Sequence, residues 1–228
     1  MITRAMVLDA LADVRDPELD EPLTELGFVA EVRVAGRAVD VRLRLPTYFC
    51  APGFAYLMVD DARDAVLRLP GAGAVTVTLD DHFAAGEITT AVGAGAGFAG
   101  AFPGESAGEL PALRQLFARK AFVARQSAVA DGLLRAGRTR DELTALRLGE
   151  LRPDPDVCRC IELRARLGLD VSPAAAAFVL ADGSPLDAAG LSRFLRVARL
   201  VRLSLEGNAG LCRSLLATRY GVAEPQTA

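Results

Sequence analysis

The chain has 228 residues, of which 51% are hydrophobic and 24% are charged, and it contains no Trp, one His and four Cys. This length suits one large or two small domains and is sufficient to bury a core. The four Cys are too few and too unevenly spaced for a disulfide scaffold, and charged residues interrupt the start, where a signal peptide needs an apolar run. The sequence contains no uninterrupted apolar run of about 18 residues, so it predicts no transmembrane helix. These features favour a globular, cytoplasmic protein without a membrane partner.

The net charge of -3 conceals an uneven distribution of charge along the chain. Residues 1–111 carry 8 Arg against 17 Asp or Glu, whereas residues 112–228 carry 18 Lys or Arg against 12 Asp or Glu. The halves are therefore near -9 and +6, which predicts two modules. The basic side chains of the second half lie along helical patterns without interleaved aromatic residues for base stacking, so we expect no nucleic-acid partner.

The first module alternates between helical and strand periodicity. Apolar spacing predicts a short amphipathic helix over 4–14. Alternating segments at 28–34 and 39–45 predict a β-hairpin with one buried face. Helical spacing over 59–69 and alternation over 75–79 predict a second helix and a third strand. The expected order of elements is αββαβ.

The stretch between the second and third strands is long enough for a crossover, and crossovers join parallel strands. The carboxyl ends of parallel neighbours lie at one edge of the sheet, so we expect Cys50 near Asp80, Asp81 and His82. Cys50 also precedes Pro52, a good first residue of a helix. The helix N-terminus favours a thiolate, the form of cysteine that binds soft metals and attacks electrophiles.

Three short motifs surround the predicted hairpin: Asp16-Pro17-Glu18-Leu19, Leu26-Gly27-Phe28-Val29 and Thr47-Tyr48-Phe49-Cys50. In this order and spacing, over about residues 4–82, the chain resembles the SufT/PaaD-like family of iron–sulfur cluster assembly domains. The resemblance implies a small α+β domain that assists the maturation of iron–sulfur and related metalloproteins. It also implies that Asp16, Glu18, Thr47 and Cys50 are the functional positions. Cys50 would be the ligand of iron or of a cluster, with the acidic loop and the Thr47 hydroxyl beside it.

The sequence departs from the family pattern around this thiol. The family usually has Pro directly after the Cys, whereas here Ala51 intervenes before Pro52. Tyr48 and Phe49 replace the usual small residues or Pro. We therefore expect a bulkier approach to Cys50 and a different partner. The segment Tyr-Phe-Cys-Ala-Pro is most similar to the form of the family associated with soluble di-iron monooxygenases.

The number of thiols limits the mechanism, because an iron–sulfur cluster typically takes four Cys, or Cys with His. The first module supplies one thiol, so either two copies share a cluster in a homodimer or the thiol binds metal transiently before a client metalloenzyme receives it. A mononuclear iron site of Cys50 with Asp16, Glu18 or His82 is also chemically possible. The alternative reading of His82 is an ordinary residue at the end of a strand, and that of Asp16 is a turn that ends a helix.

The second module is predicted to be a helical bundle. A Gly- and Ala-rich stretch at 87–110 predicts a flexible linker between a domain at 1–86 and a helical domain at 111–228. The apolar periodicity and the Gly and Pro positions predict helices at 111–136, 139–148, 154–167, 173–181, 187–203 and 206–219. The fold class of the whole chain is therefore α+β, with an αββαβ domain followed by an all-α domain.

The other three cysteines fit helix packing better than a shared metal site. Residues two apart on a helix point about 200° apart, so Cys158 and Cys160 do not aim at one ion. Cys212 shares a helix face with Leu215 and Leu216.

Two functions remain open. The first is a non-enzymatic maturation factor that handles iron or a cluster through Cys50 while the helical half recognises the client. The second is an accessory or scaffold protein that binds an oxygenase without handling metal. A third reading, a thiol enzyme, is disfavoured because no Ser-His-Asp spacing, phosphate-binding loop or Cys-x-x-Cys motif is present.

Overall fold

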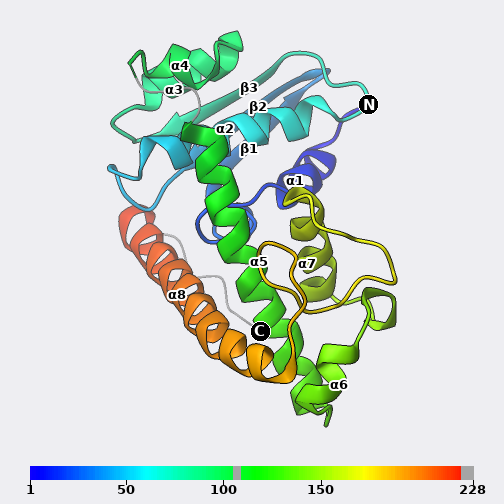
Figure 1. Cartoon of the computed structure of the whole chain (residues 1–228). Coiled ribbons are helices and arrows are strands. Elements are labelled where there is room, and N and C mark those ends of the chain that lie inside the picture. The colour runs from blue at the N-terminus through cyan, green and yellow to red at the C-terminus, as the bar shows by residue number, and fades with distance from the viewer. Residues whose placement is uncertain (105–108, 222–228) are drawn as a thin grey trace. The chain divides into compact units, whose positions relative to one another are not determined.

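The computed structural model describes residues 1–104 and 109–221 (Figure 1). The chain divides into two compact units, one of Met1–Ala112 with Gly207–Ala228 and the other of Leu113–Glu206. We call these unit 1 and unit 2. The long helix α8 (Ala188–Tyr220) contributes residues to both. Residues 207–221 therefore belong to the same unit as the start of the chain, which the predicted domains did not anticipate.

Unit 1 is built on a sheet of three strands in the order β1-β2-β3. Strand β1 (Val29–Ala35) pairs antiparallel with β2 (Ala38–Arg44), and β2 pairs parallel with β3 (Val75–Asp80). Helix α1 (Arg4–Ala12) precedes the sheet, and α2 (Pro52–Leu67) makes the crossover from β2 to β3 (Figure 1). The predicted αββαβ order and the parallel crossover are confirmed.

The core of unit 1 follows from the two periodicities. On β2 the side chains of Val39, Val41 and Leu43 alternate inward and are at most 1% exposed. Helix α2 turns Val59 and Val66 toward them, and both are fully buried. Each such side chain contributes about 1.5–3 kcal/mol through burial, so the sheet face and the α2 face specify each other.

The stretch predicted as a flexible linker is folded where it is described. It contains α3 (Ala85–Ala94) and α4 (Gly97–Ala101), and Ile88, Val92 and Phe98 pack into the core of unit 1. Gly95 ends α3 in the left-handed conformation at a φ of 64°, a role that glycine fills without strain. The Gly- and Ala-rich composition therefore reflects caps and close helix packing, and the residues from 105 to 108 lie outside the described part.

Unit 2 is mainly helical, as the predicted fold class requires. Besides the first part of α8, its elements are α5 (Glu109–Arg135, which begins in unit 1), α6 (Arg140–Ala145), the 3-10 helix η1 (Leu148–Glu150) and α7 (Pro155–Arg166). Its largest apolar cluster contains buried residues such as Leu143, Phe178, Leu191 and Leu195. No helix within the described ranges is both long and apolar enough to cross a membrane.

The helix predicted at 173–181 is wrong, because two buried polar side chains hold this segment in an irregular path. The Gln126 amide donates to the carbonyl of Val179 at 3.0 Å and accepts from the Val179 N–H at 3.0 Å. The Arg164 guanidinium donates to the carbonyls of Ala176 and Ala177 at 2.9 and 3.1 Å. These bonds satisfy the backbone without a helix, and alanine propensity is too weak to compete.

The predicted break between helices at 187–203 and 206–219 is also absent, since α8 runs continuously from Ala188 to Tyr220. A glycine within a helix costs only about 1 kcal/mol relative to alanine. Buried residues on either side of Gly207, including Ala198 and Ala209 at 0% exposed, provide packing that offsets this cost.

We expect Gln126→Ala to lower the free energy of unfolding by about 2–4 kcal/mol, since it leaves the buried N–H and C=O of Val179 unpaired. Urea unfolding followed by circular dichroism measures this loss. Gln115→Ala, an exposed position on the same helix, is the matched control and should change stability by less than about 0.5 kcal/mol. Equal effects of the two substitutions would contradict the bracing role of Gln126.

Candidate functional site

Two loops meet at one edge of the sheet, where β2 and β3 end. The parallel register pairs Arg44 with Asp80, so the segments after both strands leave at the same edge. The N–H of Phe83 donates to the carbonyl of Tyr48 at 3.2 Å, and His82 Nε2 lies 2.7 Å from the carbonyl of Cys50. The structure thus brings together the two residues, Cys50 and His82, that the crossover argument placed side by side.

His82 is engaged on both sides of its ring. Its Nδ1 accepts a hydrogen bond from the Ala84 N–H at 3.2 Å, so Nε2 carries the proton and donates to the Cys50 carbonyl. The residue is 4% exposed. In this arrangement His82 fixes the backbone of the Cys50 loop, and binding of a metal to either nitrogen would require one of these bonds to break.

The Cys50 thiol is half-buried, free and placed just before α2. Its Sγ lies 3.2 Å from the Thr47 hydroxyl, the pairing that the Thr-x-x-Cys motif implies. When the sulfur is a thiolate, the hydroxyl must be the donor, because a thiolate has no proton to give. Thr47 and Cys50 therefore form a hydrogen-bonded pair on the loop after β2.

The Asp16 side chain forms its hydrogen bonds within its own loop. Its Oδ1 accepts the N–H groups of Glu18 and Leu19 at 2.8 and 2.9 Å, and the residue is 7% exposed. Burial raises the pKa of this carboxyl to about 6, against the lowering effect of the two hydrogen bonds. The geometry matches a turn after α1, and the half-buried Glu18 lies on the same turn. The hydrogen bonds of the Asp16 carboxylate stay within this turn, and in the described part of the chain neither Asp16 nor Glu18 is hydrogen-bonded to Cys50.

The end of α8 brings three further residues to this region, and sequence reasoning had not assigned them to the site. Arg213 forms an ion pair with Glu21, and Arg219 donates to the carbonyls of Leu45 and Asp81. Cys212 also lies in this region: burial, together with the charges of Asp16, Cys50 and Glu18, raises the pKa of its thiol to about 11. Only the spacing of Cys212, Leu216 and Arg219 on one helix face could have signalled this.

An exposed cluster of aromatic rings borders the thiol. Tyr48, Phe49 and Phe83 are 44%, 77% and 46% exposed, and their ring centroids lie between 4.9 and 6.3 Å apart. Phe54, in contrast, packs partly against the core. Large exposed aromatic side chains that contact one another are typical of surfaces that bind another macromolecule.

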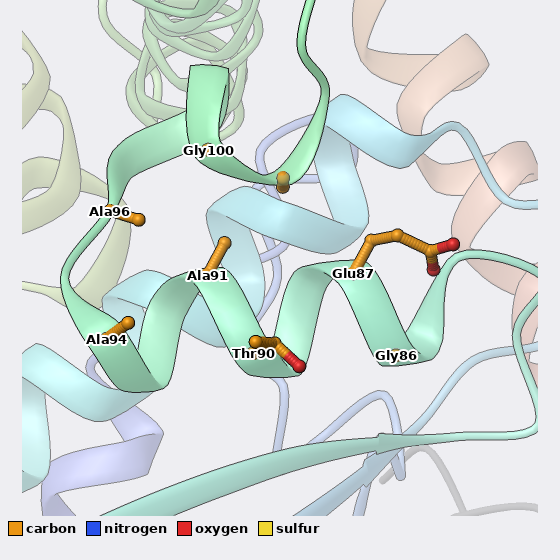
Figure 2. Close-up of a pocket in the computed structure, with 8 residues that line it drawn as sticks. Gly86, Glu87, Thr90, Ala91, Ala94, Ala96 and Gly100 are labelled. Atoms are coloured by element: carbon orange, nitrogen blue, oxygen red, sulfur yellow. The ribbon is translucent and has the colours of Figure 1, made fainter.

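Within the described ranges, no three His, Cys, Asp or Glu residues are arranged to hold a metal ion. The hollow drawn in Figure 2 has a volume of about 440 Å³ and lies on α3 and α4, where Ala91 and Ala94 lie near the chain that turns into α4. Its lining contains mainly small residues and includes no thiol or imidazole: Gly86, Glu87, Thr90, Ala91, Ala94, Ala96, Gly100 and Ala101. This hollow therefore offers no sulfur or imidazole ligand for iron.

The raised pKa of Asp16 predicts a specific pH dependence. The native state retains a proton on Asp16 between the ordinary pKa of 3.8 and the native value of about 6. The associated stability is fully present below the lower value and is lost as the pH rises through the upper one. Only the wild type loses this stability as the pH rises. We therefore expect the free energy of unfolding of Asp16→Asn, relative to that of the wild type, to increase by roughly 2–3 kcal/mol between about pH 4 and about pH 7, as measured by urea unfolding.

The control for this experiment is Asp13→Asn, an exposed carboxylate at the end of α1. Its stability difference from the wild type should not follow the same profile. A difference for Asp16→Asn that stays constant across this pH range would contradict the burial of a titrating carboxyl.

Comparisons with known proteins agree with the resemblance that the sequence motifs indicated. Residues 4–79 match the model of a family described as iron–sulfur cluster assembly protein. The chain is also 39% identical over 77 residues to an iron–sulfur cluster carrier protein of Synechocystis sp.. That match covers 34% of this chain and about a fifth, 21%, of the relative. The family match confirms the resemblance over the αββαβ segment, and the helical remainder lies outside that match.

Proposed function

We propose that unit 1 binds iron or an iron–sulfur cluster through Cys50 and passes it to a client metalloprotein. The observation that carries this proposal is the free thiol of Cys50, 3.2 Å from the Thr47 hydroxyl, on a loop clamped at the sheet edge. The segment that matches the assembly family contains this loop. A role as carrier is also the role that the name of the matching relative gives to that protein.

The ligand set supports transfer rather than retention. The described residues contain no converging group of three His, Cys, Asp or Glu side chains, whereas clusters typically need four ligands. Iron at Cys50 therefore completes its coordination with ligands from outside the chain, either from the client or from a second copy in a homodimer. When the receiving protein already supplies some of the ligands, the iron is transferred without ever losing all of its protein ligands.

The transfer needs no redox step. On binding, the Cys50 thiol releases its proton to solvent, and the sulfur donates an electron pair to iron. The Thr47 hydroxyl then donates a hydrogen bond to the bound sulfur. On release, a ligand of the client replaces Cys50 at the iron, and Cys50 takes up a proton again. The chain is a stoichiometric carrier in this scheme, and its role is not enzymatic.

The aromatic cluster of Tyr48, Phe49 and Phe83 supplies the contact surface for the protein that receives the cargo. It borders the loop of Cys50, so a partner docked on it would place its own ligands near the sulfur. The similarity of the Tyr-Phe-Cys-Ala-Pro segment leads us to propose a soluble di-iron monooxygenase as the client. Four free thiols suit a reducing compartment such as the cytoplasm.

A scaffold that binds an oxygenase without handling metal is the competing function, and the same aromatic cluster favours it. The two functions differ in what they require of Cys50. Only the carrier needs the sulfur, whereas the scaffold needs only the surface around it.

Anaerobic loading with ferrous iron and sulfide, followed by absorption spectroscopy, tests the carrier. We expect thiolate-to-iron charge-transfer bands in the wild type and their loss in Cys50→Ala. Cys158→Ala, an exposed cysteine of unit 2, is the matched control and should keep the bands. His82→Ala should weaken iron binding yet retain the bands, since His82 holds the Cys50 backbone. Unchanged bands in Cys50→Ala would leave the scaffold as the function.

A second experiment addresses the aromatic cluster. We expect Phe49→Ser to slow transfer from the loaded protein to an apo-protein acceptor by about tenfold, the usual size of an aromatic anchor. Transfer to a small chelator should not change, because a chelator needs no docking surface. Leu200→Ser, which alters another exposed apolar residue, is the control. Equal slowing with the acceptor and the chelator would exclude a docking role for this cluster.

A further inference from the structure

The last turns of α8, residues 207–220, are an integral part of unit 1. Ala209 and Leu216 are 0% and 2% exposed and belong to the same core cluster as the sheet. Leu216 Cδ2 lies 3.1 Å from the position that a Cβ on Gly27 would occupy, and Gly27 has a φ of 75°. A larger residue at 27 would be strained and would have to displace the tip of the Leu216 side chain, so the helix packs closely on the turn before β1.

One face of these turns contacts each loop of the site. Arg213 pairs with Glu21 on the loop of Asp16, and Leu216 meets Gly27. Arg219 reaches the loops after β2 and β3. Residues three and four apart on a helix lie on the same side, so a single helix face spans all three loops, although they are far away in sequence.

The Arg219 guanidinium joins the two loops at Cys50. Its Nη1 donates to the carbonyl of Leu45 at 3.2 Å, and its Nη2 donates to the carbonyl of Asp81 at 2.6 Å and pairs with the Asp81 carboxylate at 2.6 Å. Leu45 begins the segment that leads to Thr47 and Cys50. Asp81 directly precedes His82, whose ring holds the Cys50 carbonyl.

The turn at Asp81 needs this support. Asp81 has a φ of 54°, a left-handed conformation that is uncommon for a residue other than glycine. The carbonyl of Asp81 accepts a hydrogen bond from Arg219, and its carboxylate forms an ion pair with the same guanidinium. The hydroxyl of Tyr220 lies 3.5 Å from this carboxylate. The fork of a guanidinium can satisfy several oxygen acceptors at once, which a lysine ammonium does less well.

From this geometry we propose that Arg219 is a positioning residue of the Cys50 site and that the end of α8 completes that site. It acts by holding the loop of Cys50 against the loop of His82, and so sets the position of the sulfur. The proposal rests on Cys50 being the functional thiol. It also means that the segment matching the assembly family does not contain every residue that shapes the site.

The test uses the full-length protein without metal. Hydrogen exchange with mass spectrometry follows residues 45–50 and 82–84, and peptide mapping follows the rate at which iodoacetamide alkylates Cys50. In Arg219→Gln we expect exchange in both loops to become about tenfold faster, as the loss of charge-assisted bonds implies. Alkylation of Cys50 should accelerate as well, because the thiol is then less shielded by its loop.

Three matched variants separate positioning from general stability. Arg213→Gln removes an ion pair from the same helix face and should accelerate exchange near residues 16–21 only. Asp81→Asn keeps the backbone carbonyls and tolerates the left-handed turn, so its effect should be smaller than that of Arg219→Gln. Arg219→Lys should restore protection in part. Uniformly faster exchange throughout unit 1, or no change at residues 45–50 and 82–84, would overturn the proposal.

The outcome is independent of the iron experiment. Bands that survive Cys50→Ala while Arg219→Gln loosens only these loops would reject the carrier function and retain the positioning role. Bands lost in Cys50→Ala, with loops unchanged in Arg219→Gln, would do the reverse. When both hold, loaded Arg219→Gln should also show shifted charge-transfer bands, a signature that a merely destabilised protein would not produce.

Discussion

The parallel pairing of β2 with β3 is the constraint on which the site depends. The register runs from Val39 opposite Val75 to Arg44 opposite Asp80, so the chain leaves both strands at one edge. An antiparallel pairing would send the two following loops to opposite edges, and His82 could not reach the carbonyl of Cys50. The crossover helix α2 makes the parallel pairing possible, and its own N-terminus begins beside the thiol.

In the function that we propose, the clamped loop makes the single thiol of Cys50 a useful ligand. Three backbone carbonyls of this loop, those of Leu45, Tyr48 and Cys50, accept hydrogen bonds from Arg219, Phe83 and His82. The backbone is therefore fixed while the sulfur keeps only the light contact with Thr47. A fixed ligand loses little freedom when metal binds, and an incomplete ligand set lets the metal leave. This combination favours exchange over storage.

In both units, polar side chains form hydrogen bonds with backbone groups at positions where regular secondary structure ends. In unit 2, Gln126 and Arg164 satisfy the backbone of the irregular segment around 176–179. In unit 1, His82 and Arg219 do so for the loops of the site. A buried backbone group without a partner costs free energy, so a long polar side chain stabilises a path that no ladder or helix provides. These side chains come from elements distant in sequence, which hides them from any local pattern.

The sequence by itself determined the αββαβ order and the meeting of Cys50 with His82, because alternation, helical spacing and the rule for crossovers are local or topological. Through its resemblance to the assembly family, it also pointed to Thr47 as the neighbour of Cys50. Tertiary structure alone decided that His82 serves the backbone, that 173–181 is irregular and that Arg219 reaches a loop 174 residues away. The physical reason is that such contacts depend on the final position of the polar end of a side chain in the packed protein. The periodicity of a sequence indicates only on which face of a helix or strand that side chain lies.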